Sequence, residues 1–196
     1  YNAILPEYYQ VLAEEATKRD IPVLGHKPRS ISAIAAAQAG HHSFEHARLF
    51  LFEAYPGAEA LRQKYYHRYT SDEEIEGRTV TTAVMREMIE THSDSMFAEL
   101  TRVMVEEETW FCPTHITRRM DAFADNEAFR NDPRLKYILI PQRWGWGRDA
   151  DGMIDDDPTP EGRQTFMEFY EKGLELTGKA HRAGVKILAG TDANDS

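Results

Sequence analysis

Residues 21–46 read IPVLGHKPRSISAIAAAQAGHHSFEH, and this stretch decides the fold of the chain. The apolar run at 21–26 predicts a short buried strand. The small residues at 30–39 predict a helix, which a serine opens and a glycine closes. Residues 42–46 predict a second strand. A strand, a helix and a strand within about 25 residues form a tight crossover, so the two strands would run parallel.

The flanking sequence continues this alternation of helix and strand. Apolar residues at helical spacing predict the helices, and short apolar runs predict the strands. Outside 21–46 the predicted elements are a helix at 6–19, a helical and aromatic stretch at 47–78 that is broken at Pro56-Gly57, a long helix at 80–107, a strand at 109–114, an irregular polar insertion at 117–160, a helix at 161–183 and a strand at 185–190.

The order of these elements indicates the α/β class. Alternating helices and strands predict a parallel sheet with helices outside it. Four such strands are half of an eight-stranded barrel. We therefore expect a single domain over 1–196 that forms a partial (β/α)8 TIM barrel, with 117–160 as an insertion or lid. An open doubly wound sheet is the alternative.

Composition limits the classes of partner. The chain has 196 residues, 41% of them hydrophobic, and a formal net charge of -10. An acidic surface argues against nucleic acid and anionic membranes, which would repel it. No apolar run reaches the length of about 18 residues that a membrane-spanning helix requires. Cys112 is the one cysteine, so no intrachain disulfide can form, and the compartment stays open.

Three polar residues directly follow predicted strands. His26 and His46 follow the first two strands, and Asp192 follows the last. Carboxyl ends of parallel strands are where barrel and open-sheet enzymes keep their sites. Two imidazoles and a carboxylate are a suitable set for a divalent metal such as zinc. Each residue alone also has an ordinary interpretation, as a polar strand cap or as turn chemistry.

A second metal motif overlaps the same stretch. Residues 42–46 spell H-x-x-E-H, a metalloprotease pattern that needs a helix. A strand would place His42 and His46 roughly 13 Å apart, too far for one small ion. The protease interpretation is therefore set aside, and His41 and His42 are predicted to be loop residues.

Several of these segments together resemble a known family. Residues 21–26, 35–40 and 43–46 resemble the segment that joins barrel strands five and six in the amidohydrolase superfamily, nearest to its imidazolonepropionase-like and Xaa-Pro dipeptidase-like group. Residues 185–193 resemble the strand-eight motif, and 112–114 resemble the end of strand seven. The resemblance covers nearly the whole chain and is weakest at 117–160.

The resemblance implies roles for the three strand-end residues. His26 and His46 would be metal ligands on strands five and six. Asp192 would bind a second metal and act as the general base. The cofactor would be a divalent metal, zinc first, with two ions in the parent enzyme. The implied reaction is hydrolysis of a C–N bond, in a peptide or a cyclic amide, by metal-activated water.

Other features of the family have no counterpart in this chain. The His-x-His pair of strand one and the bridging carboxylated lysine of strand four are missing, and Tyr1 would follow that lysine. The resemblance therefore implies a fragment that is inactive or impaired alone and holds at most one weakly bound metal. Half a barrel would expose edge strands and core, so we expect a homo-oligomer or a partner that carries the missing N-terminal half.

Further residues are candidates for contact with a small-molecule or short peptide substrate. His115 follows the third predicted strand, and Arg143 with Trp144 and Trp146 could form a lid. The alternatives are a plain polar residue at the rim and aromatic packing of the insertion. A non-catalytic scaffold or metal-binding module stays open as a second function class. Lactone or phosphotriester hydrolysis on the same fold is a neighbouring chemistry.

Overall fold

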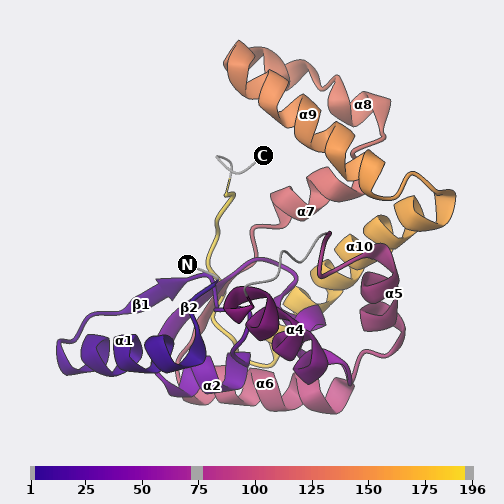
Figure 1. Ribbon diagram of the computed structural model, residues 1–196. Helices are drawn as coiled ribbons and strands as arrows, with labels where there is room; N and C mark the ends of the chain where they lie inside the picture. The colour runs from indigo at the N-terminus through magenta and orange to yellow at the C-terminus, as the bar shows by residue number, and fades with distance from the viewer. Residues whose placement is uncertain (1–2, 72–76, 193–196) are drawn as a thin grey trace.

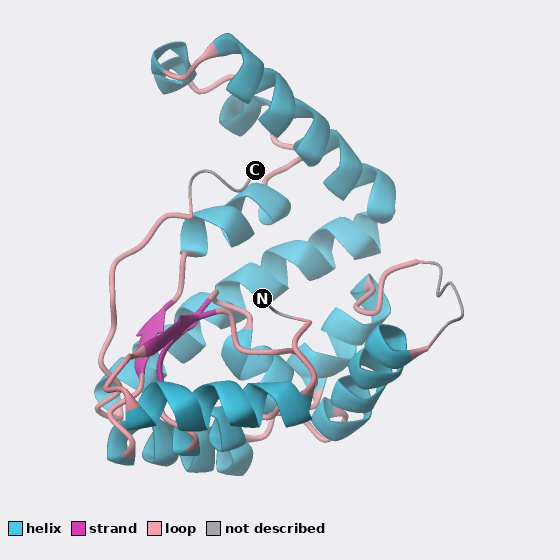
Figure 2. Cartoon of the chain, turned by 60° about the vertical axis from the view of Figure 1, so that its left-hand side comes forward, coloured by secondary structure: helices cyan, strands magenta, loops and turns pink. Residues whose placement is uncertain are grey.

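The structure is a computed structural model that describes residues 3–71 and 77–192 and belongs to the α/β class (Figures 1 and 2). A small parallel sheet lies among helices. The elements are α1 (Pro6–Lys18), β1 (Val23–Gly25), α2 (Ala33–Gln38), β2 (His41–Glu45), α3 (Leu49–Glu53), α4 (Ala58–Thr70), α5 (Thr82–Glu90), α6 (Asp94–Glu106), β3 (Trp110–Cys112), α7 (His115–Ala122), α8 (Glu127–Arg130), the 3-10 helix η1 (Pro133–Tyr137), α9 (Ile140–Asp156) and α10 (Pro160–Arg182).

The sheet has its strands in chain order, β1-β2-β3, and all of them are parallel. The segment after α10 runs along the free edge of β3. There the Phe111 N–H donates to the Lys186 carbonyl at 2.9 Å, and the Leu188 N–H donates to the Phe111 carbonyl at 2.8 Å. The predicted strand at 185–190 is thus reduced to one parallel bridge, between Phe111 and Ile187.

The crossover between β1 and β2 forms as the sequence predicts, with one shift. Ser32, and not Ser30, caps α2, because its hydroxyl oxygen accepts the Ala35 N–H at 3.1 Å. Gly40 has a φ of +87° and ends the helix in the left-handed region that glycine favours. The alanines on the inner face of α2 are fully buried, so this short helix can lie close against the sheet.

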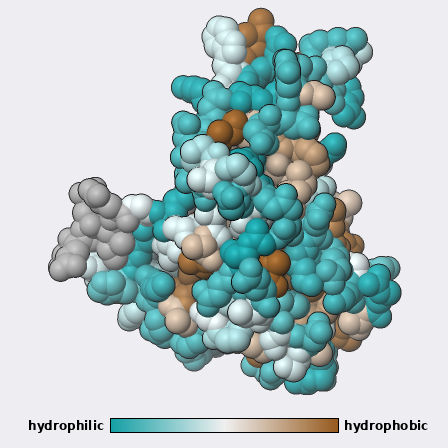
Figure 3. All heavy atoms as spheres, turned by 90° about the vertical axis from the view of Figure 1, so that its right-hand side faces the viewer, coloured by the Kyte–Doolittle hydropathy of each residue, from teal (hydrophilic) through white to brown (hydrophobic). Residues whose placement is uncertain are grey.

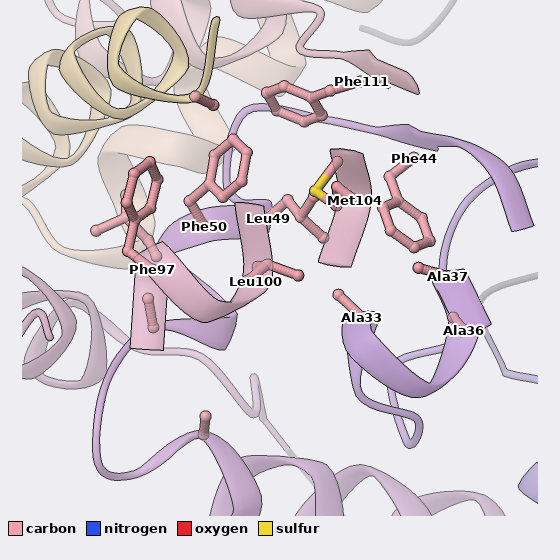
Figure 4. Close-up of a cluster of buried hydrophobic side chains, with 14 of the residues drawn as sticks. Ala33, Ala36, Ala37, Phe44, Leu49, Phe50, Phe97, Leu100, Met104 and Phe111 are labelled. Carbon is pink, nitrogen blue, oxygen red and sulfur yellow. The ribbon is translucent and has the colours of Figure 1, made fainter. Parts of the chain in front are cut away.

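Aromatic side chains form the centre of the core on one face of the sheet (Figure 4). Phe44 of β2 and Phe111 of β3 are register partners and both are fully buried. Phe50 of α3 packs edge-on against Phe111 at 4.9 Å between ring centroids and against Phe97 of α6 at 5.1 Å. The sheet is thus anchored to α3 and α6 by offset aromatic contacts.

The other face of the sheet is more open. Leu24 of β1 is 62% exposed, Trp110 of β3 is 36% exposed, and Leu188 beside β3 is 39% exposed. These side chains alternate with the buried phenylalanines, as side chains of a strand do. The expected homo-oligomer or partner remains a prediction.

The predicted long helix at 80–107 is wrong, because the chain forms two helices there. The hydroxyl oxygen of Ser93 accepts the Met96 N–H and so caps α6, while the Ser93 N–H donates to the Ala54 carbonyl at 2.8 Å. This contact with the end of α3 fixes a break that helical periodicity alone does not indicate.

The predicted irregular insertion at 117–160 is also wrong, because it folds largely as the helices α7, α8 and α9. Figure 1 shows α8 and α9 standing away from the sheet, and Figure 3 shows them as the narrower upper part of the molecule. Three glycines within α9 each cost about 1 kcal/mol of helix propensity. Arg130 of α8 offsets part of this cost by binding the Gly147 carbonyl and the Asp151 carboxylate of α9.

His41 and His42 belong to β2 and are not loop residues. His41 is 2% exposed and lies between the hydroxyl of Tyr9, 2.8 Å from Nδ1, and the Gly25 carbonyl, 3.2 Å from Nε2. A neutral ring that accepts at Nδ1 and donates at Nε2 satisfies both partners. Burial lowers the pKa of His41 to about 4.

Among the described residues, no helix combines the length and the apolar character needed to cross a membrane. This agrees with the sequence, which contains no long apolar run.

Truncation of the core is the first test of this fold. Phe44→Ala should lower the free energy of unfolding by about 3–5 kcal/mol, because it removes a fully buried ring between the sheet and the helices. Leu24→Ala on the neighbouring strand is the control and should cost much less, since Leu24 is mostly exposed. Chemical denaturation measures both. Equal losses would contradict the assigned sheet faces.

The burial of His41 predicts a pH dependence of stability. Because its pKa is lower in the folded state, about 4, than the ordinary value of 6.5, the unfolded chain takes up the proton first. The contribution is complete above the ordinary pKa and is lost as the pH falls toward 4. It amounts to about 3 kcal/mol at most. His41→Gln should flatten the dependence of the unfolding free energy over this window. An unchanged slope would show that folding does not lower the pKa of His41.

Candidate metal centre

Four residues at or just after the carboxyl ends of the neighbouring parallel segments have a left-handed backbone conformation. Gly25, His46, Thr114 and Asp192 have φ values of 109°, 75°, 44° and 53°. For residues other than glycine this conformation costs about 1–3 kcal/mol and occurs preferentially at functional sites. The shared geometry turns the chain sharply at the carboxyl edge of the sheet.

His26 and His46 meet at this edge. Their Nε2 atoms are 2.5 Å apart, and their ring centroids are 4.3 Å apart. His46 is buried, while His26 is exposed. Two imidazoles that follow adjacent parallel strands therefore direct their Nε2 atoms at one position.

Asp192 and Thr114 approach His46 from the opposite side of its ring. The Thr114 hydroxyl lies 3.0 Å from His46 Nδ1, and Asp192 Oδ2 lies 3.6 Å from the same nitrogen. Asp192 Oδ2 is buried and has no hydrogen-bond partner among the described residues. The structure thus gathers all three strand-end residues at one rim. It also adds Thr114, whose signal in the sequence was a polar residue at the end of the third strand.

Gly190 allows the last segment to reach this rim. A Cβ atom at Gly190 would lie 2.4 Å from the sulfur of Cys112. The close approach brings the chain past the end of β3, and Asp192 follows two residues later. A glycine is required here for space and not for its backbone angles.

The protonation states suit metal binding. Burial, together with the charge of nearby Arg48, lowers the pKa of His46 to about 3. Burial also lowers the pKa of His26. Both rings are therefore neutral near pH 7, which is the form that binds metals. Burial raises the pKa of Cys112 to about 11, so its sulfur is a protonated thiol and a poor ligand.

The two nitrogens are compatible with a small divalent ion after a modest adjustment. Two nitrogen ligands of a tetrahedral zinc lie about 3.3 Å apart, so the rings would separate by roughly 0.8 Å to admit one. The part of the chain that the structure describes contains no group of three or more His, Cys, Asp and Glu side chains arranged to hold a metal. The set available is the histidine pair, with the Asp192 carboxylate beside Nδ1 of His46.

A buried ion-pair network fixes the loop that carries His26. Glu53 of α3 binds Lys27 at 2.9 Å and Arg62 at 3.0 Å, and it also accepts the Ala33 N–H at 3.0 Å. One carboxylate thereby links the loop after β1 to α2, α3 and α4. Because all its partners are satisfied, we assign it a structural role.

Three arginines surround the histidine pair and were not singled out in the sequence. Arg29, Arg48 and Arg118 each follow a strand end within a few residues, and each lowers the pKa of His46. Burial lowers the pKa of Arg48 to about 10, which leaves it charged near neutral pH. Only the positions of these arginines in the sequence indicate them. Side chains just beyond a strand end lie on the same rim as the residue that ends the strand.

His115 is directed toward α10. Its Nε2 lies 3.0 Å from the Thr177 hydroxyl, and its ring meets Tyr170 edge-on at 6.4 Å between centroids. Its contact with a substrate therefore stays a prediction that these packing contacts do not support.

The insertion forms a pocket that reaches Asp192. The pocket measures about 370 Å³ and is lined mainly by apolar side chains of α7, η1 and α9, together with Arg143 and Trp146. Arg143 Nε and Trp146 Nε1 are buried and have no hydrogen-bond partner among the described residues. Trp144 is 71% exposed and does not line this pocket.

No family model, no curated protein and no solved structure matches this chain.

The close approach at Gly190 gives a test of how Asp192 is positioned. Gly190→Ala should destabilise the fold by about 1–3 kcal/mol, because the new methyl group would collide with the Cys112 sulfur. Removing that sulfur in the double variant Gly190→Ala, Cys112→Ala should recover part of the loss, which thermal unfolding measures. Additive effects of the two substitutions would show that the two residues are not in contact.

Proposed function

We propose that this chain is the part of an amidohydrolase-type (β/α)8 barrel that carries strands five to eight. Four neighbouring parallel segments in chain order, with helices between them, support this proposal. A doubly wound sheet reverses its strand order at some point, and no reversal occurs within the described segments. The resemblance of 21–46 and 185–193 to the family supports the same assignment.

The proposed reaction is hydrolysis of a C–N bond in a short peptide or cyclic amide. One observation carries it: the Nε2 atoms of two imidazoles converge, and a buried carboxylate oxygen with no hydrogen-bond partner among the described residues lies at Nδ1 on the other side of the His46 ring. His26 and His46 would hold a divalent metal, zinc first. The Lewis acidity that such an ion supplies ionises water near neutral pH and polarises a carbonyl.

Asp192 would move the proton in this reaction. Its Oδ2 has no hydrogen-bond partner within the described part of the chain and lies on the rim beside His46. A carboxylate in this position can take a proton from water and deliver it to the departing amine. Thr114 would keep the His46 ring oriented through its contact with Nδ1.

The pocket beside Asp192 would receive part of the substrate. Its apolar lining suits an apolar group, and the N–H groups of Arg143 and Trp146 are available to donate to a carbonyl or carboxylate oxygen. This arrangement assigns Arg143 to substrate binding and Trp146 to the same role. Trp144 has no part in it.

The ligand set is smaller than that of a binuclear hydrolase. Two imidazoles, with the Asp192 carboxylate on the far side of the His46 ring, would hold one ion weakly, so we expect slow or absent turnover by this chain alone. A metal-binding module without catalysis is the alternative, and metal-loaded protein that hydrolyses no amide, lactone or phosphotriester would favour it.

Metal titration tests the ligand assignment. Wild-type protein titrated with Zn²⁺ or Co²⁺ should bind about one ion, and His26→Ala or His46→Ala should weaken binding by about 100-fold or more. Asp192→Asn and Thr114→Val should weaken it by about 10- to 100-fold. Calorimetry measures the affinity, and the absorption spectrum of Co²⁺ reports the ligands.

His42→Ala is the matched control, because His42 is an exposed histidine on the same strand as the residues that lead to His46. It should leave metal affinity unchanged. If the wild type binds no more metal than the His26→Ala variant, the ligand assignment is wrong. Unfolding curves of each variant separate loss of a ligand from loss of the fold.

A further inference from the structure

A cavity lined by arginines opens next to the histidine pair. It measures about 580 Å³, and six arginines and two aspartates line it, a net charge of +4. Two of the arginines, Arg29 and Arg48, also line the small pocket that contains His26 and His46, so the two spaces adjoin. The six arginines are Arg29, Arg48, Arg68, Arg78, Arg118 and Arg148.

Two of these arginines are neutralised by carboxylates of the chain. Arg118 forms an ion pair with Asp121 one turn along α7, and Arg78 forms one with Asp156 of α9. Each of these two ion pairs compensates the charge of its arginine within the fold.

The other four have no carboxylate partner among the described residues. Arg29 lies over the ring of Tyr65 at 5.1 Å, and Arg68 donates to the Gly77 carbonyl at 2.9 Å. Arg48 lies 5.8 Å from the ring centre of Phe52. Rings and a carbonyl hold Arg29, Arg48 and Arg68 in place, and no ion pair within the described residues compensates their charge.

This gathering of like charge contrasts with the rest of the molecule. The chain contains 33 acidic and 23 basic residues, so carboxylates to pair with arginine are abundant. Among the described residues, Asp149 is the one other carboxylate that lines the cavity beside these four cations, and their mutual repulsion disfavours the cluster unless a further anion joins it. Arginine also presents a planar fork of donors that matches the oxygens of a phosphate group.

We propose that this cavity binds a small molecule that carries a phosphate group. A phosphate monoester carries about -1.5 to -2 charges near pH 7 and three acceptor oxygens, which uses several arginines at once, whereas one carboxylate carries a single charge. The volume lies in the range of small-molecule sites. The acidic net charge of the chain disfavours a long polyanion such as nucleic acid.

The cavity lies on the same rim as the candidate metal centre. Arg29, Arg48 and Arg118 follow β1, β2 and β3, as His26, His46 and Thr114 do. One further step rests on the proposed function. The phosphate group would belong to the substrate and would hold the scissile bond of that substrate near the histidine pair. The anion site itself does not depend on that function.

Calorimetric titration of the metal-free protein with phenyl phosphate and with inorganic phosphate, at constant ionic strength and with a chelator present, tests the proposal. Saturable binding at one site is expected. Arg29→Gln and Arg148→Gln should each weaken it by about tenfold or more, the usual effect of losing one charged hydrogen bond. These two are chosen because Arg48 is more deeply placed and its loss could impair folding.

Arg102→Gln is the matched control, because Arg102 is an exposed arginine on α6 outside the cavity. It should bind phenyl phosphate as the wild type does. Absent saturation, or equal weakening in Arg102→Gln, would overturn the site. Tighter binding of succinate or of a short oligonucleotide than of phenyl phosphate would overturn the phosphate assignment.

The same titration with the His26→Ala variant separates this inference from the proposed function. Phosphate binding should persist there while metal binding is lost. Persistence would show that the anion site stands without the metal centre. Loss of phosphate binding in a folded His26→Ala protein would show that the arginines alone do not form the site.

Discussion

Parallel pairing between β1, β2, β3 and the bridge at Ile187 is the constraint on which the rest of the structure depends. It brings the carboxyl ends of four segments to one edge, and the buried ring of Phe44 fixes which face of the sheet meets the helices. A shift of one residue in register would send Phe44 to the open face and would move His46 away from His26. Core and rim are therefore set by the same hydrogen bonds.

The arginines at the rim have two electrostatic effects, one on His46 and one on the neighbouring cavity. Burial, helped by the arginines after the strand ends, lowers the pKa of His46 to about 3 and keeps the ring neutral, which is the form that a metal requires. The same arginines create a positive cavity in a chain whose net charge is -10. The net charge therefore governs the interaction of the whole surface with large polyanions. The local electrostatic field of the cavity governs the binding of a small ligand. The rim can attract an anion even though the molecule as a whole repels one.

The insertion contributes a pocket because it is helical. The helix α9 places Arg143 and Trp146, and α7 places Ile116 and Met120, around a space that ends at Asp192. An irregular loop would not hold two N–H donors in fixed positions without partners. Contacts with other segments, such as Arg130 with α9 and Arg163 with the Met153 carbonyl, hold this part of the chain together despite its glycines.

The sequence by itself determined the α/β class, the crossover at 21–46 and the strand-end positions of His26, His46 and Asp192, because apolar runs and turn residues act locally. Tertiary structure decided the break at Ser93, the helical insertion, the contact of Thr114 with His46 and the grouping of the arginines. Each of these rests on contacts between residues far apart in the chain. Local periodicity carries no information about such contacts, since they exist only once the sheet has aligned its strand ends.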